Sequence, residues 1–167
     1  MKFVLRFAGL IAFLAGLVAF ILMMATKAIV VTNGNLQVVY EGTTAIFGKT
    51  EKALGVEVVT KGSVLALIGW ILLIVGLIAA CLGVLASLLH LKPLVKLGGL
   101  FMLGAAGCFL VAAIFMFLVV PTFYAANDAN VPDNAAIGAG WVIGAILSLV
   151  AGAFSALPAV TGLLGKK

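Results

Sequence analysis

The chain has 167 residues, of which 65% are hydrophobic and only 9% are charged, and its mean hydropathy is +1.37. This composition excludes a water-soluble globular fold, an intrinsically disordered chain and a disulfide-rich secreted scaffold. The net charge of +5 and the 20 glycines are typical of a protein that lies mostly in a bilayer and has small residues where its helices meet.

Four long stretches of the chain carry no charge, and each exceeds the roughly 20 residues that cross a hydrocarbon core about 30 Å thick. They predict transmembrane helices near residues 3–26, 63–90, 97–120 and 136–164. The first apolar run is longer than the core of a signal peptide, so we expect it to be retained. The predicted fold class is an all-α membrane protein, a four-transmembrane-helix bundle in one domain over residues 1–167.

The segment between the first two predicted helices, residues 27–62, has the chemistry of β-strands. Residues 28–32 and 35–40 are rich in β-branched side chains and flank Asn33 and Gly34, which suit the centre of a type I′ turn. The pattern therefore predicts a β-hairpin.

Two further features complete this segment. Residues 56–60 alternate well enough to supply a third strand, and residues 42–48 predict a short turn or a one-turn helix. We expect a small extracellular antiparallel β-sheet, because an isolated hairpin is only marginally stable in water. Its predicted recognition surface consists of Asn33, Gly34, Tyr40, Ile46 and Phe47, and the alternative is a covered connector that merely caps the bundle.

The second predicted helix has glycines at heptad spacing, and the fourth has a small residue at every fourth position. Such stripes allow the close approach of helix backbones on which association in lipid depends. We expect them to pack within one bundle, and the alternative is that the stripe of the fourth helix mediates oligomerisation. Pro158 is expected to kink or loosen the last turns of that helix. The predicted packing residues are Gly69, Gly76, Gly83, Gly140, Gly144, Ser148, Gly152 and Ala156.

The distribution of charge predicts the orientation in the membrane. With both termini in the cytoplasm, the inner segments hold six Lys and Arg residues, and the outer segments hold four together with every acidic residue. We therefore expect a multi-pass plasma-membrane protein with cytoplasmic termini. Its partner is the lipid bilayer, and the basic charge does not indicate nucleic-acid binding. The predicted interface anchors are Trp70, Tyr124, Trp141, Lys92 and Lys96.

The sequence has few groups that carry chemistry. His90 is expected at the inner interface rather than in a metal site, and Cys81 and Cys108 are expected to act as small hydrophobes within their helices. No acid or base lies deep in a predicted helix, and the serines there have no neighbouring base. We therefore predict a protein that is not an enzyme and has no catalytic, cofactor or metal site.

The plan of a long first outer loop with strands, a tight basic inner turn and a short second outer loop resembles the tetraspan architecture of claudin-type proteins. The claudin signature of Trp, Gly-Leu-Trp and two cysteines in the first outer loop is absent. The run Ala45-Ile46-Phe47-Gly48, together with Gly69-Trp70, resembles small four-helix membrane proteins of unassigned function in Gram-positive bacteria. The resemblance implies the topology and no activity.

Two functional hypotheses follow. The first is a structural or interaction protein whose bundle anchors the outer sheet for self-association or for another membrane protein. The second is an accessory subunit, or an oligomeric pore or transport component, for an apolar or neutral solute. The first is preferred because the sequence offers no polar lining for a solute path.

Overall fold

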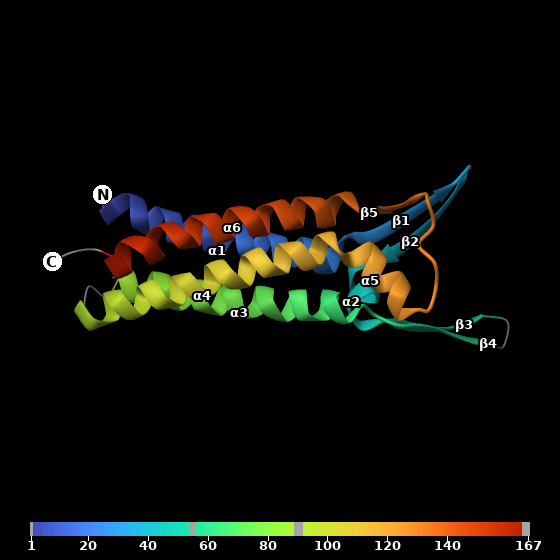
Figure 1. Cartoon of the computed structure of the whole chain (residues 1–167), viewed down its shortest axis with the longest axis horizontal. Helices are drawn as coiled ribbons and strands as arrows, with labels where there is room; N and C mark the ends of the chain where they lie inside the picture. The colour runs from blue at the N-terminus through green and yellow to red at the C-terminus, as the bar shows by residue number, and fades with distance from the viewer. Residues whose placement is uncertain (1, 54–55, 89–91, 165–167) are drawn as a thin grey trace.

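The computed structural model describes residues 2–53, 56–88 and 92–164. The elements in these ranges form a long helical bundle with a smaller, mostly β-structured region at one end (Figure 1). In chain order they are α1 (Lys2–Ala25), β1 (Lys27–Asn33), β2 (Leu36–Glu41), α2 (Gly42–Phe47), β3 (Lys49–Ala53), β4 (Val56–Thr60), α3 (Val64–Leu88), α4 (Lys92–Phe117), α5 (Val119–Ala126), β5 (Ala135–Ile137) and α6 (Ala139–Leu164).

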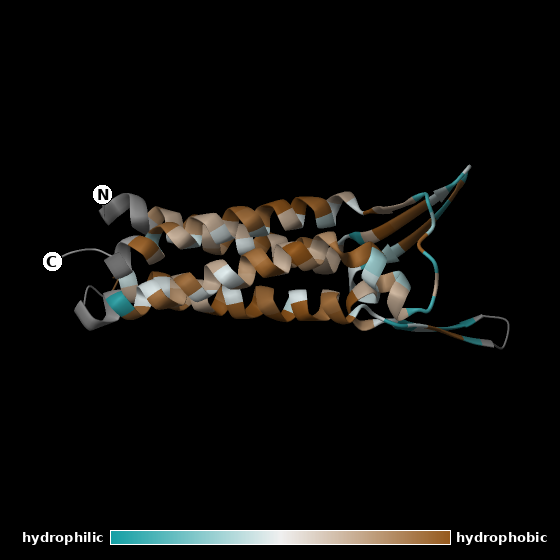
Figure 2. Cartoon of the chain, in the orientation of Figure 1, coloured by the Kyte–Doolittle hydropathy of each residue, from teal (hydrophilic) through white to brown (hydrophobic). Residues whose placement is uncertain are grey.

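The bundle consists of α1, α3, α4 and α6, which pack side by side in the cyclic order α1–α3–α4–α6. Each is long and apolar enough to cross a membrane, so the prediction of four such helices is confirmed. Figure 2 shows hydrophobic residues along the length of the bundle and hydrophilic ones concentrated at the β-structured end. We call that end, residues 26–63 and 118–138, the cap, and the opposite end of the bundle the basic end.

The third predicted helix was expected to end at Val120, but the chain is helical as far as Ala126 with a break at Leu118. Pro121 explains the break, because its ring clashes with the carbonyl of the residue four positions earlier, and α4 ends at that residue, Phe117. The short helix α5 then runs from Val119 into the cap. Pro158, in contrast, lies inside α6, which continues to Leu164.

The prediction of a small antiparallel sheet is confirmed, but its third strand was assigned wrongly. The sheet has the order β2-β1-β5, so the third strand comes from residues 135–137 of the second connection. The fourth helix consequently begins at Ala139 rather than at Ala136. Residues 56–60 instead form β4, which pairs with β3 in a separate two-stranded sheet with Lys52 opposite Glu57.

The turn between β1 and β2 lies one residue beyond its predicted position. Asn33 pairs with Leu36, so the two central residues are Gly34 and Asn35. Gly34 has a φ of 58° and Asn35 does not have a positive φ, which is the φ pattern of a type II′ turn rather than of the expected type I′ turn. Only glycine adopts this first position without a steric cost.

The cap and the bundle share one hydrophobic core. Buried side chains continue without interruption from Met102 and Phe109 in the bundle, through Met23 at the end of α1, to Ile29 in β1 and Ile46 in α2. Helix α2, predicted as a short turn or one-turn helix, therefore closes the end of the bundle. The structure places the sheet directly on the helices that support it.

Candidate functional site

The centre of the bundle is filled by large side chains of α4 at heptad spacing. Met102, Phe109 and Met116 are all buried, and each points at glycines on the neighbouring helices. Residues seven apart return to the same face of a helix in such packing, so the three side chains form a continuous ladder along the bundle. Met102 meets Gly9 and Gly83, Phe109 meets Gly16 and Gly76, and Met116 meets Gly144.

The fit around Phe109 shows how tight this ladder is. A Cβ atom at Gly16 would lie 2.6 Å from Phe109 Cζ, and one at Gly76 would lie 2.9 Å from Phe109 Cε1. Gly69, the remaining glycine of the heptad stripe on α3, faces Phe115: a Cβ atom at Gly69 would lie 3.3 Å from the Cβ of Phe115. The stripe of α3 therefore faces into the same chain.

The small residues of α6 are also used inside the bundle. A Cβ at Gly152 would lie 2.8 Å from Leu110 Cγ, and one at Gly144 would lie 2.7 Å from Met116 Cε. Ser148 is buried against the sulfur of Met116. Gly140 abuts the side chain of Thr26, and Ala156 is half-buried.

The two tryptophans that were predicted to anchor the interface have different environments. Trp141 is fully buried, so its ring packs against protein and does not contact lipid as an interface anchor would. Its Nε1–H donates a hydrogen bond of 3.0 Å to the carbonyl of Met23. This carbonyl lies in the last turn of α1, where no N–H of the same helix is available to donate to it. Trp70 is half-buried between Phe20 and Phe47, and its buried Nε1 has no hydrogen-bond partner.

Tyr124, the third predicted aromatic anchor, is also buried, because it belongs to α5 and packs under the three-stranded sheet. Its ring lies 6.5 Å from that of Tyr40 and 5.9 Å from that of Phe123. Burial raises the pKa of the Tyr124 hydroxyl above its ordinary value, and the neighbouring Tyr40 adds to the effect. This cluster joins the sheet to α5, so Tyr124 acts as a core residue of the cap.

Two asparagines connect the two cap segments. The side chain of Asn127 accepts a hydrogen bond of 2.8 Å from the Lys61 N–H and donates one of 2.9 Å to the Lys61 carbonyl, like a neighbouring strand. Its amide also donates to the carbonyl of Phe123 at the end of α5. Asn134 hydrogen-bonds to the carbonyl of Thr32 in β1. Sequence reasoning did not single out either residue.

The predicted recognition residues do not form one surface. Asn33 and Gly34 are exposed at the tip of the β1–β2 hairpin, far along the cap from α2 (Figure 1). Tyr40 is half-buried against Phe123, and Ile46 is buried in the core, so neither is available as predicted. Phe47 is 54% exposed, but it lies at the junction between the cap and the bundle.

Four of the apolar side chains that the cap exposes are on its two hairpins. Leu36 and Val38 protrude from the same face of β2, and Leu36 is 76% exposed. Val58 and Val59 are both exposed on β4, on opposite faces of the strand. Sequence reasoning did not single out these four residues, and it expected residues 56–60 to be the third strand of the same sheet as β2.

Charge is divided between the two ends of the molecule. All five acidic residues lie in the cap, where Lys49, Lys52 and Lys61 make exposed ion pairs with Glu51, Glu57 and Asp128. Glu51 raises the pKa of the Lys49 ammonium, first through its hydrogen bond and then through its charge. The other end holds the first two turns of α1 and of α4, which include Lys2, Arg6, Lys92 and Lys96.

Lys96 is exposed, as expected of an interface anchor, and Lys92 is the first residue of α4. His90, predicted at the inner interface, lies outside the described residues. Cys81 is exposed on α3 and Cys108 is half-buried on α4, and both are free thiols. Within residues 2–53, 56–88 and 92–164, no three His, Cys, Asp or Glu side chains gather where they could hold a metal ion.

The sequence matches no protein-family model, and no curated protein is similar to it at a significant level. The resemblance to claudin-type proteins in topology, and to small four-helix membrane proteins in two short motifs, therefore stays a prediction.

Proposed function

We propose that the protein is a non-enzymatic tetraspan protein of the plasma membrane, whose bundle holds the cap outside the cell for binding to a second copy or to another membrane protein. The proposal rests on one contrast. The predicted packing glycines face α4 side chains of the same chain, whereas the hairpins of the cap leave strand edges and apolar side chains uncovered; these glycines are Gly69, Gly76, Gly83, Gly144 and Gly152. Exposed strand edges accept a further strand by main-chain hydrogen bonding.

The division of charge supports the orientation. Lys and Arg near membrane-spanning helices favour the cytoplasmic side, and the basic end combines four such residues in α1 and α4 with no acidic residue in the first turn of either helix. A cation at the N-terminal end of a helix is unfavourable for the helix dipole. The stability of these helices does not account for the position of the charges, whereas the membrane orientation does.

The second hypothesis, a pore or transport component, has less support. The axis of the bundle is occupied by Met102, Phe109 and Met116, which close onto glycines of the three other helices. A path for a solute would need these side chains to leave a tightly packed ladder. The geometry therefore favours recognition by the cap.

The experiment compares two neighbouring positions of β2. Val38 and Gln37 are both exposed but protrude from opposite faces of the strand, and only the face of Val38 continues the apolar row that begins at Leu36. We expect Val38→Lys to remove self-association or a co-purifying membrane protein in blue-native electrophoresis after mild detergent extraction. Gln37→Lys should leave the assembly intact. Mass spectrometry of the excised band identifies what is bound.

The proposal fails if the parent protein runs as a clean monomer with no partner. It also fails if Val38→Lys and Gln37→Lys behave alike in both measurements. A folded Val38→Lys protein is verified by an unchanged thermal unfolding midpoint, which is expected because the side chain is exposed.

A further inference from the structure

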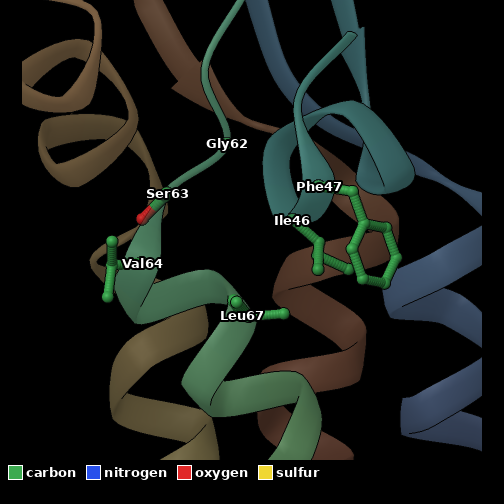
Figure 3. A pocket seen from close by; sticks show the side chains of 6 residues that line it. All are labelled: Ile46, Phe47, Gly62, Ser63, Val64 and Leu67. Atoms are coloured by element: carbon green, nitrogen blue, oxygen red, sulfur yellow. The ribbon is translucent and has the colours of Figure 1, made fainter.

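A small apolar groove lies where α2 meets the start of α3. It is lined by Ile46 and Phe47 of α2 and by Gly62, Ser63, Val64 and Leu67 around the first turn of α3 (Figure 3). Its volume is about 240 Å³, below the 300–1,000 Å³ that is usual for a site enclosing a whole drug-sized ligand. A groove of this size accommodates a part of a molecule whose remainder lies outside.

The position of the groove identifies the medium that it opens to. The segment of α3 that is long and apolar enough to span a membrane begins at Val64, so in a bilayer the groove would lie near the end of the hydrocarbon core. Phe47 at one side is 54% exposed and Val64 at the other is 67% exposed. From there the exposed residues Ile68 and Ile71 continue down the surface of α3 that faces lipid. The groove is therefore continuous with the lipid-facing surface of the bundle.

The polar groups around the groove are already engaged. The Ser63 hydroxyl donates to Thr122 Oγ1 at 2.7 Å and accepts from the Ala66 N–H as the N-terminal cap of α3. Lys49 and Lys61, which flank the lining residues in the sequence, are paired with Glu51 and Asp128. The site thus offers apolar contact without a free charge to select an ionic headgroup.

We propose that this groove binds a segment of the acyl chain of one membrane lipid, which packs between Phe47 and Leu67. In Figure 3 the side chains of Ile46 and Leu67 point toward one another across the groove, and the ring of Phe47 lies beside them. The ring of Phe47 is in turn backed by Trp70, with 5.2 Å between the ring centroids. The lipid holds α2, and with it the base of the β3–β4 hairpin, against α3. This inference does not depend on what the cap recognises.

The test measures lipid that stays bound when the full chain is transferred from nanodiscs to detergent and analysed by native mass spectrometry. Leu67→Trp fills the groove, and Ile71→Trp adds the same side chain one turn further along the exposed surface of α3. We expect one retained dioleoyl lipid per chain in the parent and in Ile71→Trp. The retained fraction should be about tenfold lower in Leu67→Trp, because a filled groove leaves no space for the acyl chain.

Phe47→Ala provides a second variant that leaves the core intact, because Phe47 is largely exposed. It removes one wall, so retention should also fall. Nanodiscs of phosphatidylcholine and of phosphatidylglycerol should give equal retention, since the lysines near the groove are paired. The inference is overturned if the parent retains no lipid, if all variants retain it equally, if retention requires the anionic headgroup, or if a co-purified protein protects the groove instead.

Discussion

Each of the two tryptophans carries one indole N–H, and only one of these groups has a partner. Trp141 donates to the carbonyl of Met23, whereas the Nε1 of Trp70 is buried without an acceptor. We expect Trp141→Phe to lower the free energy of unfolding by about 1–3 kcal/mol, because a buried carbonyl loses its hydrogen bond. Trp70→Phe is the matched control and should cost less. Thermal unfolding midpoints in detergent measure both, and equal losses would contradict the role assigned to Trp141.

Tyr124 predicts a dependence of stability on alkaline pH. Its pKa is raised above the ordinary 10.0 in the folded protein by burial, so folding favours the neutral hydroxyl. The stabilisation is complete below pH 10.0 and is lost as the pH rises through the folded-state pKa. Unfolding midpoints measured between about pH 9 and about pH 11 should therefore fall in the parent and fall less in Tyr124→Phe. Parallel curves for the two proteins would contradict the prediction.

At the scale of residues, the sequence indicated which side chains have a structural role more often than it indicated what each side chain contacts. Glycines at heptad spacing on α3 were recognised as packing positions, and the structure places Gly76 against Phe109. The three aromatic anchors were placed by their distance from helix ends alone. Whether an aromatic ring faces lipid or protein depends on the neighbouring helix, and Trp141 and Tyr124 both face protein.

At the scale of elements, the close packing of α4 against α6 depends on Gly152. A larger side chain there collides with Leu110, while the next residue, Ala153, is exposed on the outer face of α6. We expect Gly152→Leu to destabilise the protein by about 1–3 kcal/mol through overpacking, and Ala153→Leu to have little effect. Expression, extraction and thermal unfolding report the difference. Equal behaviour of the two variants would show that α4 and α6 do not pack as closely at Gly152 as described.

The β3–β4 hairpin is held at its base by Asn127. Neither strand of this sheet pairs with a third, and an isolated hairpin is only marginally stable. We expect Asn127→Ala to leave the thermal midpoint of the bundle nearly unchanged and to increase trypsin cleavage at Lys49 and Lys52, because the Lys61 backbone loses both of its side-chain hydrogen bonds.

The exposed Asn130, in the same connection, supplies the control variant Asn130→Ala, which should be cleaved like the parent. Limited proteolysis followed by mass spectrometry locates the cuts. Equal cleavage rates in Asn127→Ala and Asn130→Ala would remove Asn127 as the support of the hairpin.

At the scale of elements, long periodic or charge-free segments were predictable and short ones were not. The four spanning helices and the first hairpin follow from local composition. Strand β5 has three residues and exists only because it pairs with β1 from a distant part of the sequence. Helix α5 was missed because the third predicted helix ended at Val120, just before Pro121, although proline is tolerated in the first turn of a helix.

For the whole molecule, the division of charge predicts the orientation of the cap. A cysteine introduced at Asn33, at the exposed tip of the first hairpin, should react with a membrane-impermeant maleimide in intact cells. A cysteine introduced at Lys96, at the basic end, should react only after permeabilisation. Cys81 and Cys108 are replaced by Ala in both proteins to remove their own signal. Labelling of Lys96→Cys in intact cells would reverse the topology.

The ladder of α4 also constrains how the chain assembles during synthesis. Helices α1 and α3 leave the ribosome before α4. The space beside Gly16 and Gly76 is filled by Phe109, which has not been synthesised at that stage. Helices of a membrane protein insert individually and associate afterwards through close packing. The first two crossings therefore pack together incompletely until the third arrives, and a nascent chain arrested before α4 would leave these glycine faces open to lipid.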